Sequence, residues 1–137
     1  MKQAVLYYSI GGHCAKIATS IAEKTGAELI EILPVRKWTG WMAYPICGFQ
    51  ATSGRRVKLR KINADLRNFD HLTVVSPIHA SRVAAAVRSF LFENRSHYSN
   101  VKLVLCHGDQ TNTYESAKIR LEKELMFTFS EFESFAD

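Results

Sequence analysis

Residues 3–33 read QAVLYYSIGGHCAKIATSIAEKTGAELIEIL, and this stretch decides the fold. It opens with an apolar, aromatic-rich run at 3–8, which is typical of a buried strand. Two adjacent glycines follow, and apolar residues then recur at helical spacing up to Gly26, which ends the predicted helix. A second apolar run occupies 28–33. The stretch therefore predicts a strand, a glycine loop, a helix and a second strand.

The same order of elements continues in the second half of the chain. The run HLTVVS at 71–76 predicts a buried strand that Pro77 ends, and 82–93 carries apolar residues at helical spacing. The run VKLVLC at 101–106 predicts the next strand, with a helix from about residue 113. Strands that alternate with helices, and that lack a regular polar–apolar alternation, indicate parallel strands buried on both faces. The expected fold class is α/β.

Two further stretches carry weaker patterns. Between 34 and 70 we expect one short helix, around Trp38 and Trp41, followed by a long ordered connection. The ending MFTFSEFESFAD predicts a fifth strand in its first half, with no amphipathic helix after it. If its phenylalanines are exposed, they form an apolar patch that predicts a homodimer. These phenylalanines are Phe127, Phe129, Phe132 and Phe135.

Length and composition set the broad class. A chain of 137 residues, 47% hydrophobic and 23% charged, suffices for one core of ordinary size, so residues 1–137 are expected to form a single domain. No run of about 18 apolar residues and no signal-peptide pattern occurs, which disfavours membrane spanning and export. The three cysteines form no C-x-x-C pair, so neither a disulfide framework nor a zinc ribbon is supported. The expected location is the cytoplasm.

The net charge of +5 is concentrated between Pro34 and Asp70. Such a block attracts anions, either a phosphate, an acidic partner protein or nucleic acid, and the plainer alternative is a solvated basic loop. Nucleic acid is disfavoured because no aromatic residues interleave 55–61. The cations of this block are Arg36, Lys37, Arg55, Arg56, Lys58, Arg60, Lys61 and Arg67.

Three loops are the candidate ligand site. In parallel α/β sheets, ligands bind beyond the carboxyl ends of the strands, where the strand order reverses, which indicates 9–14, 76–82 and 106–113. The first loop lies between a strand and a helix, where backbone N–H groups and the helix dipole attract a phosphate. A tight turn without a ligand is the alternative interpretation.

Each of these loops also carries one histidine, and a cysteine borders two of them. Imidazole and thiolate are ligands for zinc and copper, so a metal site is an alternative. No pair has the short spacing of structural zinc motifs, so no metal is predicted. A protonated His13 or His79 could instead stabilise an anionic ligand. For Cys14, a packing role is favoured over a reactive thiolate at a helix start.

The residues resemble the short flavodoxin-like proteins over about 3–125. YYSIGGHCAKIATSIAEKTG, starting at Tyr7, is similar to their first strand, phosphate loop and first helix. The segment 48–91 is similar to their middle region, and SPIHASR at 76–82 stands where they have a Ser-Pro-x-Trp-Ala-Gly-Arg-type flavin loop. The resemblance implies a doubly wound, three-layer α/β/α fold with strand order 2-1-3-4-5, here without the last helix. It also implies FMN as the cofactor.

The resemblance assigns FMN contacts to all three loops. Ser9 would donate to the phosphate, His79 would take the place of the tryptophan beside the flavin ring, and the third loop would close the other side. Arg82 would contact FMN or begin a helix as a solvated cation. The implied FMN-binding residues are Ser9, Ile10, Gly11, Gly12, His13, Cys14, Ser76, Pro77, Ile78, His79, Ala80, Ser81, Arg82, His107, Gly108, Asp109 and Gln110. No catalytic residue is predicted.

Three functions remain open from the sequence. The first is an FMN-binding redox protein, an electron carrier or the flavin partner of a reductase, whose protein partner has an acidic docking face. The second is an NAD(P)H-dependent quinone or flavin reductase. The third is a divergent domain without flavin that acts as a binding module. It is favoured by His79, and by Gly11 and Cys14, which stand where hydroxyl residues are common in the family.

Overall fold

The computed structural model describes residues 2–10, 12–35, 45–46, 49–50, 56–62, 64–108 and 111–136. Along the chain its elements are β1 (Gln3–Tyr7), α1 (His13–Thr25), β2 (Glu28–Glu31), η2 (Leu66–Asn68), β3 (His71–His79), β4 (Arg82–Val83), α3 (Ala85–Glu93), η3 (Arg95–His97), β5 (Val101–His107), α4 (Glu115–Leu125) and β6 (Glu131–Ala136). The short helix expected around Trp38 and Trp41 lies outside the described residues.

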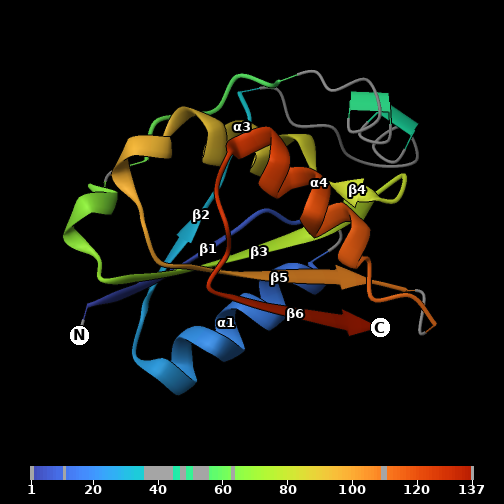
Figure 1. Ribbon diagram of the computed structural model, residues 1–137. Coiled ribbons are helices and arrows are strands. Elements are labelled where there is room, and N and C mark those ends of the chain that lie inside the picture. Colours follow the sequence, from blue (N-terminus) through green and yellow to red (C-terminus); the bar gives the residue numbers. More distant parts are fainter. Residues whose placement is uncertain are drawn as a thin grey trace.

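Five of the strands form one parallel sheet in the order β2-β1-β3-β5-β6. Counted along the chain without the two-residue β4, this is the predicted order 2-1-3-4-5, which is thereby confirmed. Helix α1 covers one face of the sheet, and α3 and α4 cover the other (Figure 1). The connections leave β1 and β3 in opposite directions across the sheet, so the reversal of strand order falls between these two strands.

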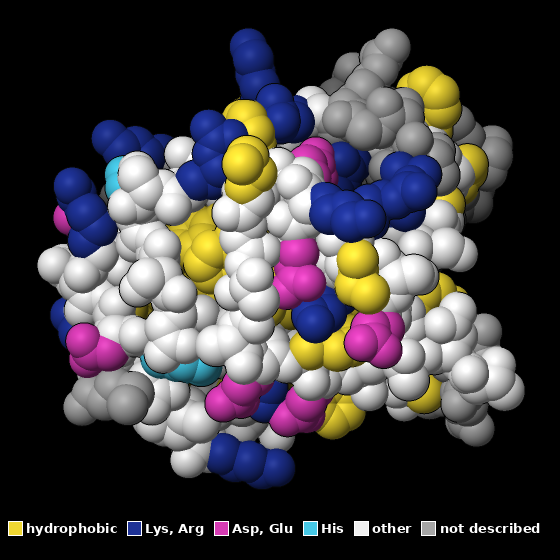
Figure 2. All heavy atoms as spheres, viewed as in Figure 1, with side chains coloured by type: hydrophobic (Ala, Val, Ile, Leu, Met, Phe, Trp, Pro, Cys, Tyr) yellow, Lys and Arg dark blue, Asp and Glu magenta, His cyan; other side chains and the backbone are white. Residues whose placement is uncertain are grey.

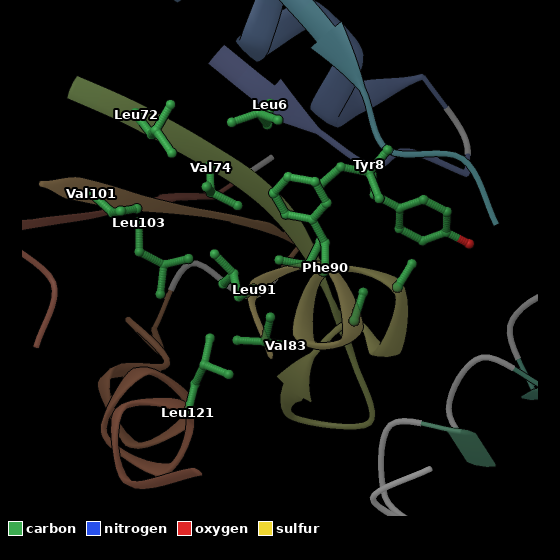
Figure 3. Close-up of a cluster of buried hydrophobic side chains, with 14 of the residues drawn as sticks. Leu6, Tyr8, Leu72, Val74, Val83, Phe90, Leu91, Val101, Leu103 and Leu121 are labelled. Carbon is green, nitrogen blue, oxygen red and sulfur yellow. The ribbon is translucent and has the colours of Figure 1, made fainter. Parts of the chain in front are cut away.

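The face under α3 and α4 holds the larger apolar cluster. Leu6, Val74 and Leu103 point from three neighbouring strands toward Phe90 on α3 and Leu121 on α4 (Figure 3). All five side chains are buried, and each such side chain stabilises the fold by about 1.5–3 kcal/mol relative to an exposed one. Tyr8 lies at the edge of this cluster, with its hydroxyl directed away from the aliphatic side chains.

The face under α1 is packed with smaller residues. Ala18 and Ala22, one helical turn apart, are buried against Val5, Val75 and their neighbours on the strands. Because small side chains let the helix backbone approach the sheet, α1 packs closely on this face. This contact positions the start of α1 beside the carboxyl end of β1.

The basic connection is ordered where the structure describes it. The Val35 N–H donates to the Lys58 carbonyl (2.8 Å), and the Val57 N–H donates to the Ser89 hydroxyl on α3 (2.9 Å). The Arg56 guanidinium lies 3.2 Å from the ring centroid of Phe92. Part of the basic block is therefore fastened to α3 rather than solvated along its whole length.

The predicted fifth strand was placed too early. β6 lies in the second half of the ending, because Phe127 and Phe129 are held by Glu122 of α4: the Phe127 N–H donates to its carbonyl and the Phe129 N–H to its carboxylate. Phe129 is buried, while Phe127 and Phe132 pack against the core, which leaves Phe135 exposed at 38%. The expected apolar patch is not formed, so the homodimer prediction loses the observation behind it.

The helices of the described part are also too short or too polar for a lipid bilayer. None of them could cross a membrane.

Candidate functional site

The candidate site is the edge where the carboxyl ends of β1, β3 and β5 meet. The Tyr8 ring, directly after β1, contacts the His79 ring at the end of β3 edge-on, with 6.2 Å between centroids. This contact bridges the two strands between which the strand order reverses. The first two predicted loops are therefore brought together, and the third follows the adjacent strand β5.

The first loop is closed by Ser9. Its hydroxyl oxygen accepts a hydrogen bond from the Gly12 N–H (3.0 Å), which leaves the hydroxyl hydrogen to donate elsewhere. Gly12 has φ +88°, and a Cβ built on it meets nothing within 4 Å, so the loop faces open space there. Helix α1 starts at His13, without an acidic residue in its first turn. This geometry suits an anion, because the positive end of the helix dipole points into that space.

Other residues of the first loop have packing roles or are not described. Ile10 packs against the core under α3 and α4, and Cys14, the second residue of α1, is buried in the core between α1 and the sheet. The packing role favoured for Cys14 is the one its burial supports. Gly11 lies outside the described residues.

The second predicted loop is wrong in shape. Pro77 does not end the strand: β3 runs on to His79, a turn at Ala80 and Ser81 follows, and Arg82 begins the short antiparallel strand β4. Pro77 has no N–H to donate, but no hydrogen bond of the sheet is lost. At this position the N–H would point toward β1, and the last hydrogen bond between β1 and β3 is already made by the Tyr8 N–H and the Val75 carbonyl.

The turn itself is strained. Ala80 has φ +50° and Ser81 has φ +64°, as in the type I′ turn that usually takes asparagine and glycine. Both side chains are exposed. Strained backbone of this kind costs about 1–3 kcal/mol per residue and persists where the surroundings enforce it, commonly at ligand sites. The turn places His79 and Arg82 opposite each other, as the pair that closes the hairpin.

Ser76 does not face the site. It is 0% exposed, its hydroxyl donates to the Pro77 carbonyl (2.9 Å), and its oxygen accepts from the Ala84 N–H (3.3 Å) just before α3. Ser76 therefore fastens the start of α3, while Pro77 and Ile78 are half-buried and Ile78 packs on the core.

His79 is the most distinctive group of the site. Its side chain is 6% exposed, and neither ring nitrogen has a hydrogen-bond partner within the described residues. Burial lowers the pKa of His79 from 6.5 to about 4, so the ring is neutral near pH 7 rather than protonated. A neutral imidazole carries one N–H donor and one acceptor nitrogen. Both nitrogens are buried at the carboxyl end of β3, and burying them without a hydrogen-bond partner lowers the stability of the fold.

The third segment is anchored by His107. Its Nε2 is hydrogen-bonded to the Ser134 hydroxyl on β6, and its ring packs on Tyr114 with 4.6 Å between centroids. Its Nδ1 is buried and, in the described part of the chain, has no partner. Gly108 is exposed, and Asp109 and Gln110 lie outside the described residues.

The sequence interpretation missed the residues that hold these histidines. Tyr8, Tyr114 and Ser134 fix the rings of His79 and His107 from outside the predicted loops or from a later strand. Tyr8 could have been found as the residue directly before Ser9. Ser134 could not, because its approach depends on the register of β5 with β6.

The metal alternative finds no support in the geometry. Among the described residues, no three His, Cys, Asp or Glu side chains come together as a possible metal site. Cys14 and Cys106 are buried in the core between α1 and the sheet.

Solved structures share this architecture at low sequence identity. A protein from Bacteroides eggerthii, provisionally named a flavoprotein, superposes with a TM-score of 0.82 at 17% identity, over 98% of this chain and 87% of that chain. A flavoprotein from Lactobacillus acidophilus in complex with FMN gives 0.69 at 18% identity, over 98% and 90%. A flavodoxin, WrbA-like protein from Agrobacterium tumefaciens gives 0.58 at 15%, over 90% and 73%.

These likenesses establish that the chain has the flavodoxin-like fold. No protein-family model and no curated protein sequence matches it.

Proposed function

We propose that this chain is an FMN-binding redox protein, an electron carrier or the flavin partner of a reductase. The observation that carries the proposal is His79: a neutral, buried imidazole without a hydrogen-bond partner in the described chain, at the switch point of the sheet. In this fold that edge is where ligands bind. The structural neighbours named as flavoproteins, one in complex with FMN, support the choice of ligand.

The start of α1 fits the phosphate of FMN. Gly12 leaves the space before the helix open, the Ser9 hydroxyl has its hydrogen to donate, and no carboxylate in the first helical turn would repel an anion. Backbone N–H groups at a helix start favour negative charge by up to about 1 kcal/mol at exposed sites. These residues would hold the phosphate by charge and by backbone contact.

His79 and His107 fit the ring system. Both ring nitrogens of His79 and the Nδ1 of His107 lack protein partners in the described part and would hydrogen-bond to the polar edge of a heterocycle. Tyr8 and Tyr114 keep the two imidazoles in place. When bound, FMN supplies the electron-transfer chemistry, while these residues bind it, orient it and exclude water. The net charge of +5 suits a partner protein with an acidic docking face.

A flavin-free binding module is the second candidate. Ser76 is turned inward, and a hairpin takes the place of the expected open loop, so the second segment offers fewer polar groups than the resemblance implied. The two candidates differ in one measurable property, the affinity for FMN.

An absorbance spectrum and an FMN titration separate them. We expect the purified protein to show bound-flavin peaks near ~370 and ~450 nm, and the apo protein to quench FMN fluorescence on titration. Absence of binding at ~50 μM FMN would reject the redox protein and favour the flavin-free module.

Two glycines of α1 provide a matched pair for the phosphate contact. Gly12 and Gly26 lie at opposite ends of the helix, both have positive φ, and a Cβ on either meets nothing within 4 Å. Alanine at each should therefore cost similar stability, about 1 kcal/mol. We expect Gly12→Ala to weaken FMN binding about tenfold and Gly26→Ala to leave it unchanged. Equal affinities for the two variants would contradict the placement of the phosphate.

A further inference from the structure

A cavity lies beside the candidate site, between β4, α3 and α4. It has a volume of about 130 Å³. Its charged lining residues are Arg82, Arg88, Arg120 and Glu124. Three arginines and one glutamate thus contribute to the lining of a small space, together with Val83, Ala117 and Leu121. Figure 2 shows Lys and Arg side chains gathered on the surface where α4 meets β4.

Arg88 forms the fixed wall of this cavity. It is 7% exposed, its Nη1 lies 3.6 Å from the Glu124 carboxylate, its Nε donates to the Val83 carbonyl (3.3 Å), and its Nη2 donates to the Gln50 carbonyl (3.0 Å). Burial lowers the pKa of Arg88 and Glu124 acts against this, yet a guanidinium stays charged in proteins. The only carboxylate lining the described cavity is therefore already engaged by Arg88.

The remaining charge belongs to Arg82 and Arg120. Arg82 is half-buried on β4 and Arg120 is exposed on α4, so the two reach the cavity from different elements. Guanidinium groups bind phosphate oxygens through paired N–H donors, more specifically than lysine does. A water molecule takes up about 30 Å³ in the liquid, so the cavity has room for a tetrahedral oxyanion.

We propose that Arg82, Arg120 and the fixed Arg88 form a binding site for a phosphomonoester group, distinct from the phosphate loop at the start of α1. Arg82 pairs with His79 across the β3–β4 turn, so a phosphorylated molecule held here would reach the edge where β1 and β3 end. The site takes a second phosphorylated ligand and does not depend on whether FMN binds.

A phosphate titration followed by amide NMR tests this site. The probe is inorganic phosphate, with sodium chloride at matched ionic strength as the salt control and acetate as the test for carboxylates. We expect saturable shifts at the amides of Arg82, Val83 and 117–124 with phosphate, and none with chloride. Shifts with acetate of equal affinity would overturn the phosphomonoester assignment.

Three variants test which cations bind the phosphate. Arg82→Gln and Arg120→Gln should each weaken phosphate binding at these amides at least about fivefold, without changing phosphate shifts at the start of α1. The control is Lys123→Gln, an exposed cation on α4 that does not line the cavity. An equal loss in Lys123→Gln, or the absence of saturable shifts in the unmodified protein, would overturn the site.

Discussion

The two ends of the sheet treat their buried polar groups in opposite ways. At the amino ends, the hydroxyl of the part-buried Tyr98 donates to the Leu91 carbonyl (2.7 Å), and at the surface the Lys2 N–H donates to the exposed Asp70 carboxylate (2.9 Å). At the carboxyl ends, both ring nitrogens of His79 and the Nδ1 of His107 have no partner within the described residues. These polar groups of the amino end are satisfied within the protein, while three imidazole nitrogens of the carboxyl end have no partner in the described chain.

The largest expected effect of this difference is on stability at low pH. The folded-state pKa of His79 is about 4, against 6.5 for the free side chain, so the unfolded chain binds a proton in this window that the folded chain does not. The contribution of neutral His79 to the free energy of unfolding is therefore complete above pH 6.5. It is lost as the pH falls to 4, which lowers the free energy of unfolding by about 3 kcal/mol. Urea denaturation of the apo protein between pH 4 and 7 measures it.

The comparison variant for this window is His79→Phe, which has no titrating group at this position. Its free energy of unfolding should depend less steeply on pH than that of the unmodified apo protein. Identical slopes would mean that His79 is hydrated in the folded protein and that the carboxyl end is not as described.

The next effect is on stability at neutral pH. His79→Phe removes two buried polar atoms that lack partners in the described structure and keeps a ring against Tyr8, so we expect the apo protein to gain about 1–2 kcal/mol. The same variant should bind FMN more weakly. Thermal and urea unfolding measure the first result and fluorescence titration the second. A loss of stability without a loss of affinity would make His79 a packing residue.

At the amino ends of the strands, the corresponding substitution to phenylalanine should lower the stability instead of raising it. Tyr98→Phe also replaces a polar ring by phenylalanine, but the lost hydroxyl leaves the Leu91 carbonyl without its donor, so we expect a loss of about 1 kcal/mol. Burial raises the pKa of Tyr98 to about 12, which is consistent with an enclosed hydroxyl. FMN affinity should not change. A neutral or stabilising Tyr98→Phe would remove the contrast between the two ends.

The features of the fold and of the site that could be predicted from the sequence are those determined by residues close together in the chain. The buried runs around Val5, Val74 and Leu103 gave the strands, and their alternation with helices gave the parallel sheet, because a strand buried on both faces needs a continuous apolar run. The phosphate loop was also local, since Gly12 and the start of α1 are adjacent in the chain.

The errors came from contacts between distant residues. A proline normally ends a strand, but β3 continues past Pro77 because its neighbour β1 has already ended there. Only the register of β1 with β3 shows this. The last strand was predicted too early because Phe127 and Phe129 are residues typical of strands, although here they pack against α4 and the core. The inward turn of Ser76 depends on the Ala84 N–H, which is eight positions away.

The most direct test of the account is to map FMN onto the backbone amides of the apo protein by NMR. We predict that the shifted amides cluster at 9–14, 79–82 and 107–108. A cavity of about 620 Å³ at the amino ends, lined in part by Arg60, Leu66 and His97, offers the competing location. Shifts concentrated around that cavity, with the amides at the carboxyl ends unchanged, would contradict the central claim that the open polar end of the sheet binds the ligand.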